Sequence, residues 1–220
     1  MSITLYYHPL SSYCHKVLTA LYEANTPFGK TIVNLGDPQE RAALQARWPF
    51  GKFPVVHDSE RDHNVAESSI IIEYLDRFHR GDVLMIPLDP ENALEVRYWD
   101  RFFDLYVHTP MQAIVADRIG GGKGDMAPQR AMLDTAYGMI DTHMQGRAWA
   151  STSGFTLADC AAAPALFYAR AVHPVPERAG NLKAYFERLI ARPSYAQVLQ
   201  DAKPFFQYFP FQDKLEPRFV

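Results

Sequence analysis

The sequence predicts a small α/β domain followed by an all-α domain, on three observations. Strand patterns and helix patterns alternate through residues 1–80. Residues 81–90 then carry one glycine and two prolines and no sustained periodicity, which is typical of a linker. From residue 91 to residue 220, apolar side chains recur mainly at helical spacing. We therefore expect one domain at 1–80, a linker at 81–90 and a helical domain at 91–220.

The first elements are a strand and a helix joined by a short loop. The β-branched and aromatic run Ile3–Tyr7 is closed by a histidine and a proline, which predicts a strand that ends in a loop. A helix is predicted from Ser12 to about residues 25–27. Its apolar residues share one face at spacings of i, i+3, i+4 and i+7: Cys14, Val17, Leu18 and Leu21.

The remaining elements follow from the same two periodicities. Strands are predicted at 28–34, 53–58 and 64–66, and helices at 40–47 and around 71–78. The second domain is expected to contain five helices, at 91–119, 129–144, 156–172, 182–191 and 194–201. Pro110 should bend or break the first of these five, because proline lacks an N–H and clashes with the preceding turn. The tail from Pro204 onward is aromatic and irregular.

Composition excludes several classes of protein. The 220 residues are 48% hydrophobic and include only two cysteines, which rules out a disulfide-stapled miniprotein and intrinsic disorder. With 22 basic and 25 acidic residues there is no positive excess for nucleic acid, so we expect no nucleic-acid partner. No apolar run approaches the roughly 20 residues that span a bilayer, and no basic-then-apolar leader is present. We therefore expect a cytoplasmic protein without a membrane partner.

The cysteines and histidines show no metal-binding pattern. Cys14 and Cys160 do not form a CxxC or zinc-type spacing, and the eight histidines show no HxxxH pair. We expect two free thiols and no metal site. The glycine-rich segment 120–124 lacks the residues of a phosphate-binding loop and is interpreted as an interhelical loop.

The loop before the first helix could stabilise a bound thiolate. Ser11 and Ser12 stand at the amino end of that helix, where free N–H groups and the macrodipole favour negative charge. Lowering a thiol pKa by about 2 units requires roughly 2.7 kcal/mol. One hydroxyl hydrogen bond to the anion, at about 1.5–3 kcal/mol, and a dipole contribution of about 0.3–1 kcal/mol suffice. The alternative is that both serines only cap the helix.

Two further segments offer groups for a peptide-like ligand. Pro54 directly precedes a predicted strand, and a cis bond there would leave the Phe53 backbone free to pair with an extended ligand; a trans loop proline is the alternative. Glu67 and Ser68 open the helix around 71–78, where the N–H groups and the hydroxyl could receive a carboxylate while Glu67 accepts from an ammonium. A simple helix cap is again the alternative.

Taken together, these motifs resemble the glutathione transferase family. The matching stretches are S-S-Y-C-H-K-V, W-P-F-G-K-F-P-V-V and A-E-S-S-I-I-I-E-Y-L, followed in the helical half by F-T-L-A-D at 155–159 and A-R-P-S at 191–194. In 155–159, Thr156 and Asp159 stand three apart, as reciprocal capping requires. The resemblance, to cytosolic serine-type members of bacterial kind, runs from about Ile3 to Asp201. It implies the glutathione transferase fold, with a thioredoxin-like first domain and an all-α second domain.

The resemblance also implies how glutathione, as co-substrate, is bound. Ser11 stands where serine-type members keep the hydroxyl that hydrogen-bonds the glutathione sulfur, and Ser12 is the alternative. The rest of glutathione, from the glycyl carboxylate through the cysteinyl backbone to the γ-glutamyl end, is expected to lie on five residues: Lys52, Phe53, Pro54, Glu67 and Ser68. An electrophile pocket is expected to be lined by Leu10, Phe102, Phe103 and Tyr106, with burial in the core or in a dimer as the alternative.

The expected activity is conjugation of the glutathione thiolate to small apolar electrophiles, as in detoxification, by a homodimer. The dimer contact is expected between segments 70–78 and 91–106. Two alternatives stay open. One is a glutathione-dependent reductase that uses Cys14, although helical spacing turns Cys14 toward the core. The other is a binding protein that shares the fold without catalysis.

Overall fold

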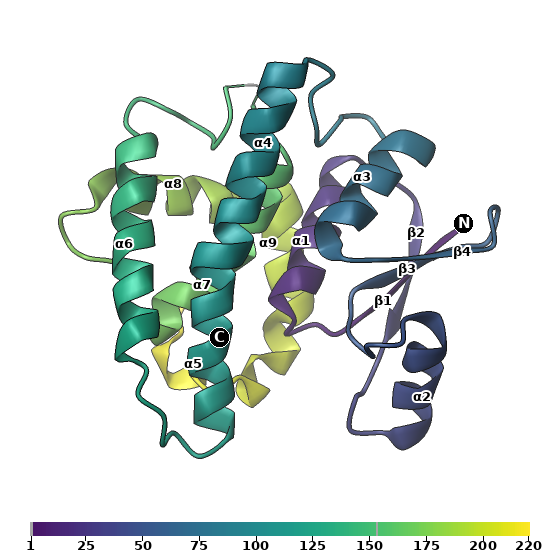
Figure 1. Cartoon of the computed structure of the whole chain (residues 1–220), viewed down its shortest axis with the longest axis horizontal. Helices are drawn as coiled ribbons and strands as arrows, with labels where there is room; N and C mark the ends of the chain where they lie inside the picture. Colours follow the sequence, from purple (N-terminus) through teal and green to yellow (C-terminus); the bar gives the residue numbers. More distant parts are fainter. Residues whose placement is uncertain (1, 153) are drawn as a thin grey trace.

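The computed structural model describes residues 2–152 and 154–220 and has an α/β half followed by a helical half (Figure 1). The element order agrees with the predicted order, and the thioredoxin-like domain followed by a helical domain is confirmed. The α/β half consists of β1 (Ile3–Tyr7), α1 (Ser12–Glu23), β2 (Phe28–Ile32), α2 (Pro38–Arg47), β3 (Val55–Asp58), β4 (His63–Ala66) and α3 (Ser68–Phe78).

The helical half contains six α-helices, one π-helical segment and two short 3₁₀ segments among the described residues. They are α4 (Pro90–Phe102), the π-helical η1 (Phe103–His108), α5 (Thr109–Ile119), α6 (Ala127–His143), α7 (Leu157–Val172), α8 (Gly180–Ala191), α9 (Pro193–Ala202), η2 (Lys203–Tyr208) and η3 (Gln212–Lys214). Across the described ranges, no helix has the length and apolar character needed to cross a bilayer.

The four strands form one mixed sheet in the order β2-β1-β3-β4. β1 runs parallel to β2 and antiparallel to β3, so that Ile3 lies opposite Phe28 on one side and Asp58 on the other. Alternate residues of β1 are buried, as expected for a strand with one face on the core. Because α1 follows β1 directly and leads to the parallel strand β2, the start of α1 lies at the carboxyl end of β1.

Helix α1 connects the two halves of the molecule. Every residue from Cys14 to Leu21 is buried, because α1 contacts α3 in the α/β half and α7 and α9 in the helical half. Figure 1 shows α1 between the sheet and the helices α7 and α9. A side chain on α1 can therefore reach across the boundary between the halves.

Of the predicted bend or break at Pro110, the break does not occur, and the chain stays helical from α4 through η1 to α5. Pro110 lies in the first turn of α5, directly after the π-helical segment. The wider π-turn tolerates the missing N–H, and the Thr109 hydroxyl donates to the Asp104 carbonyl at 3.0 Å. Because a π-turn shifts the side chains that follow it relative to regular helical spacing, faces inferred from a 3.6-residue period are displaced in this segment.

The start of α7 is fixed by a buried carboxylate. The reciprocal cap between Thr156 and Asp159 is present, with the Thr156 N–H donating to Asp159 Oδ2 at 2.9 Å. Asp159 Oδ1 also accepts from the Ala150 N–H at 2.9 Å and from the Tyr185 hydroxyl at 2.6 Å. Burial raises the pKa of Asp159 to about 6, although these donors favour the charged form. Asp159 thus connects both the loop before α7 and helix α8 to the start of α7 through hydrogen bonds.

We predict that Asp159→Ala lowers the free energy of unfolding by about 2–4 kcal/mol, because buried donors lose their acceptor. The reciprocal cap alone would account for about 0.5–2 kcal/mol. Asp37→Ala is the matched control, since Asp37 caps α2 at an exposed site by accepting from the N–H groups of Gln39 and Glu40. Denaturant unfolding of both variants checks this. Equal losses in the two would contradict the anchoring role of Asp159.

Candidate functional site

A cleft of about 510 Å³ lies between the α/β half and the helical half. One wall comes from the start of α1, the segment before β3 and the first turns of α3. The other wall comes from α4, η1 and α5. The five residues predicted to bind glutathione all line the first wall: Lys52, Phe53, Pro54, Glu67 and Ser68. The structure therefore brings together residues that are separated in the sequence.

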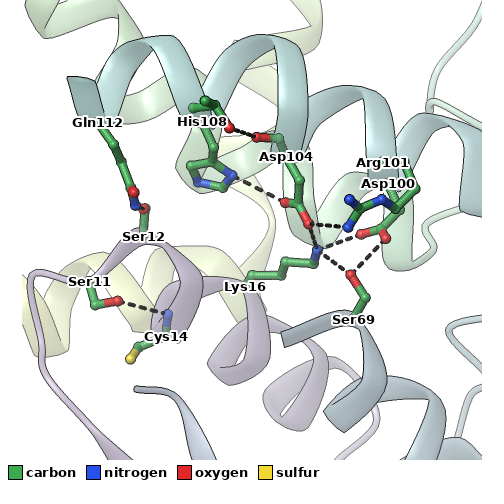
Figure 2. Close-up of polar contacts among 11 residues, drawn as sticks. Ser11, Ser12, Cys14, Lys16, Ser69, Asp100, Arg101, Asp104, His108 and Gln112 are labelled. Atoms are coloured by element: carbon green, nitrogen blue, oxygen red, sulfur yellow. Dashed lines mark hydrogen bonds and ion pairs between the residues drawn. The ribbon is translucent and has the colours of Figure 1, made fainter. Parts of the chain in front are cut away.

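The two serines at the start of α1 have different surroundings. Ser11 is the N-cap residue, half-buried, and its Oγ accepts from the Cys14 N–H at 3.3 Å. Ser12 is buried, and its Oγ accepts from Nε2 of Gln112, a residue of the opposite wall, at 3.4 Å (Figure 2). The predicted capping role of Ser11 is thus present. In this hydrogen bond the Ser11 hydroxyl is only an acceptor, so its O–H remains free to donate to an anion.

The backbone at the cleft is unusual in two places. The Phe53–Pro54 peptide bond is cis, as the resemblance implied. Glu67, the residue before α3, has a φ of 68° and lies in the left-handed region that favours glycine. Such a conformation costs about 1–3 kcal/mol and occurs most often at binding sites. The exposed Glu67 side chain has no hydrogen-bond partner in the part of the chain that the structure describes.

A buried lysine joins the two walls behind the cleft. Lys16 of α1 places its Nζ 2.5 Å from Asp100 Oδ1 and 2.9 Å from Asp104 Oδ2. The same Nζ donates to Ser69 Oγ at 2.9 Å, and Ser69 donates to Asp100 Oδ2 at 2.8 Å. Figure 2 shows these four side chains, hereafter the Lys16 cluster, converging from α1, α3, α4 and η1.

The pKa values of the two carboxyl groups of the Lys16 cluster are shifted in opposite directions. Burial raises the pKa of Asp100, and the neighbouring Asp104 charge adds to this. Burial also acts on Asp104, but Lys16 and His108 outweigh it and lower the pKa of Asp104 to about 2. His108 Nδ1 lies 3.3 Å from Asp104 Oδ1, and burial lowers the pKa of His108. Asp104 is therefore the more acidic of the two carboxyl groups that contact Lys16.

Cys14 is fully buried on the inner face of α1. Burial raises the pKa of its thiol to about 12, even though contacts with Ser11 and the His8 backbone lower it. A thiol in this state is a poor nucleophile at neutral pH, which opposes the reductase alternative. Among residues 2–152 and 154–220, no group of histidine, cysteine, aspartate and glutamate side chains is arranged to hold a metal ion.

The residues expected to form an electrophile pocket do not line this cleft. Phe102 and Phe103 are buried in the helical core. Phe102 and the exposed Tyr106 line a separate apolar groove of about 520 Å³ between α4, η1 and α6. Leu10 is half-buried and packs against the main core. For the three aromatic residues the physical reason is the helix face, since their side chains lie on the sides of α4 and η1 that point away from the cleft.

The sequence interpretation missed the polar residues that form the second wall. Apart from Leu105, these are Arg97, Asp100, Arg101, Asp104, Thr109 and Gln112. A signal was present, because most of these residues recur at three- or four-residue intervals along the segment predicted as one helix. The aromatic residues that lie between these polar residues form the stronger pattern in the sequence.

Two family models match most of the chain. The model for "Glutathione S-transferase, N-terminal domain" matches residues 5–82, and that for "Glutathione S-transferase, C-terminal domain" matches residues 94–188. The chain is 27% identical over 211 residues to glutathione S-transferase F13 of Arabidopsis thaliana, covering 90% of this chain and 95% of that protein.

A solved structure and a second curated relative are also similar to most of this chain. A glutathione S-transferase of Methylobacterium radiotolerans in complex with glutathione sulfonate superposes with a TM-score of 0.77 at 27% identity, covering 89% of this chain and 93% of that one. FtsZ-localized protein A of Caulobacter vibrioides is 26% identical over 214 residues, covering 91% of this chain and 92% of that protein. The fold and both domain matches together show that this chain belongs to the glutathione S-transferase family.

Proposed function

We propose that the chain is a glutathione transferase in which Ser11 stabilises the glutathione thiolate. The observation that carries the proposal is the position of the five predicted glutathione residues along one cleft wall beside the start of α1. A glutathione S-transferase similar to this chain has been solved with glutathione sulfonate bound, which supports the choice of ligand.

The proposed reaction has three steps, served by Ser11 at the start of α1 and by the residues that line the cleft. Ser11 and the amino end of α1 favour the thiolate, so the thiol proton leaves to solvent. The Phe53 backbone, Lys52 and the Glu67–Ser68 turn hold the peptide, which fixes the direction of the sulfur. The thiolate then attacks an electrophilic carbon, forming a sulfur–carbon bond as the leaving group departs. The rate gain comes mainly from proximity.

A binding protein without conjugating activity is the second candidate. Its support is the relative named FtsZ-localized protein A, which matches this chain over nearly the same length and at nearly the same identity as the curated transferase. Glutathione binding is compatible with both candidates, because the fold does not determine the function. Turnover of an electrophile distinguishes them. For either candidate we propose a cytoplasmic protein, and for the transferase a role in detoxification.

We also propose a homodimer formed by the outer surfaces of α3 and α4. Segments 70–78 and 91–106 expose six large apolar side chains: Ile70, Phe78, Leu94, Tyr98, Leu105 and Tyr106. On the helical side, Tyr98 and Tyr106 line the apolar groove between α4, η1 and α6, where Met132 and Met139 are also exposed. Contiguous apolar surface of this kind marks an interaction site, and a two-fold contact buries each patch twice.

The variant Ser11→Ala should raise the pKa of bound glutathione by about 1–2 units, because the anion loses a hydroxyl donor. Conjugation at neutral pH should fall accordingly, with little change in glutathione affinity. Titration of the thiolate absorbance against pH measures the shift, and Ser12→Ala is the neighbouring comparison. An unshifted curve in Ser11→Ala, or a shift only in Ser12→Ala, would show that Ser11 is not the activating group.

Removing either group of the Glu67–Ser68 turn should weaken glutathione binding without destabilising the fold. For Glu67→Gln and Ser68→Ala we expect a dissociation constant about tenfold higher, since the first loses the negative charge that faces the ammonium and the second loses a hydroxyl hydrogen bond to the carboxylate. Calorimetric titration measures this, with Glu60→Gln on the exposed turn between β3 and β4 as the control. If both variants bind glutathione as tightly as the parent, the turn acts only as a helix cap and the prediction is wrong.

At micromolar concentration, sedimentation equilibrium should report about twice the chain mass of 25.0 kDa. Tyr98→Asp should shift the protein toward the monomer, because a desolvated carboxylate cannot be accommodated in an apolar contact. A parent protein that is monomeric throughout this range would exclude the proposed interface.

A further inference from the structure

The second wall of the cleft contains several charges, most of which are already neutralised. Arg97 makes two parallel hydrogen bonds with Glu73, from Nε at 3.0 Å and from Nη2 at 2.9 Å. Asp100 and Asp104 are held by Lys16. The charged groups of these side chains therefore already pair across the two walls, and they have few free donors or acceptors for a ligand.

Arg101 is the exception on this wall. Its side chain is 59% exposed, and its nearest carboxylate oxygen, Asp104 Oδ2, lies 3.9 Å away from Nη1. That oxygen already accepts from Lys16 at 2.9 Å. Within the described part of the chain, Arg101 makes no hydrogen bond. Its guanidinium thus presents a planar set of N–H donors at the cleft, the geometry that binds a carboxylate through two hydrogen bonds.

Arg101 and the Glu67–Ser68 turn lie at the same end of the cleft. Asp100, the residue before Arg101, accepts a hydrogen bond from Ser69, the residue after Ser68. Figure 2 shows Arg101 beside Asp100, above Ser69 at the start of α3. Arg101 and Glu67 also both act electrostatically on the Tyr13 hydroxyl, which lines the same cleft. The start of α1, where Ser11 is proposed to bind the sulfur, faces α5 instead, through the contact of Gln112 with Ser12.

At this end the cleft offers one carboxylate and one guanidinium that make no side-chain hydrogen bond. Among the residues that the structure describes, the Glu67 side chain makes none, and the Arg101 side chain has only the 3.9 Å ion pair with Asp104. An α-amino-acid head group carries one ammonium and one carboxylate on the same carbon. A site with one free carboxylate and one free guanidinium therefore has the complementary charges for such a head group.

We propose that Arg101 binds the α-carboxylate of the γ-glutamyl group, from the wall opposite Ser68, while Glu67 binds the ammonium. The inference deepens the proposed function and rests on it, because it concerns the same glutathione. The carboxylate then bridges the first turn of α3 and helix α4. Arg101 is a specificity-determining residue that selects a ligand with a free α-carboxylate over one without it.

A pair of ligands that differ only in that carboxylate tests this inference. Glutathione is compared by calorimetric titration with 4-aminobutanoyl-Cys-Gly, which keeps the amine and the thiol and lacks the α-carboxylate. In the parent, glutathione should bind about 10- to 100-fold more tightly than the analogue, the range expected for a charge-assisted contact. Arg101→Gln should lower this ratio toward 1. Arg101→Lys should restore part of it, since it keeps the charge and loses the two-pronged geometry.

The control variant is Arg178→Gln, at an exposed site between α7 and α8, which should keep the parent ratio. An Arg101→Gln protein with the parent ratio, or one that weakens both ligands equally, would overturn the inference. Normal glutathione binding without conjugation of any electrophile would contradict the proposed transferase and leave the role of Arg101 intact. A parent that binds no glutathione would overturn both.

Discussion

The cleft depends on the contact of one buried ammonium with two carboxylates from the other half of the chain. Lys16 is fully buried, and its ion pairs with Asp100 and Asp104 connect α1 to α4 and η1. Replacing such a cluster by apolar residues is often neutral for stability, whereas removing one member leaves a buried charge unpaired and costs about 3–5 kcal/mol. Its main effect is therefore geometric, because it fixes how the two walls face each other.

The same cluster links that geometry to ligand recognition. Ser69 hydrogen-bonds both Lys16 and Asp100, so the first turn of α3 is held against α4 before any ligand arrives. The strained Glu67 backbone and the free Arg101 guanidinium lie directly beside this contact. A head group that bridges them meets a site formed in advance, which reduces the entropy lost on binding.

Much of this structure could be predicted from the sequence, and the failures have physical causes. Period-2 and period-3.6 patterns located β1, α1 and α7, and local motifs located Phe53, Pro54, Glu67 and Ser68, because those features depend on nearby residues. The second wall could not be assigned in the same way. Its role depends on contacts between residues about 30 to 90 positions apart, such as Ser69 with Asp100 and Lys16 with Asp104. The π-helical η1 also shifts the faces expected from regular periodicity.

The crystal structure of the chain with glutathione bound tests the account most directly. The account predicts the sulfur within hydrogen-bond distance of Ser11 Oγ, the cysteinyl backbone paired with Phe53, and the γ-glutamyl head group between Glu67 and Arg101. The Lys16 cluster should be unchanged, because the walls are already in place. Glutathione bound outside this cleft, or with its sulfur directed away from Ser11 toward the far end of α4, would contradict the account.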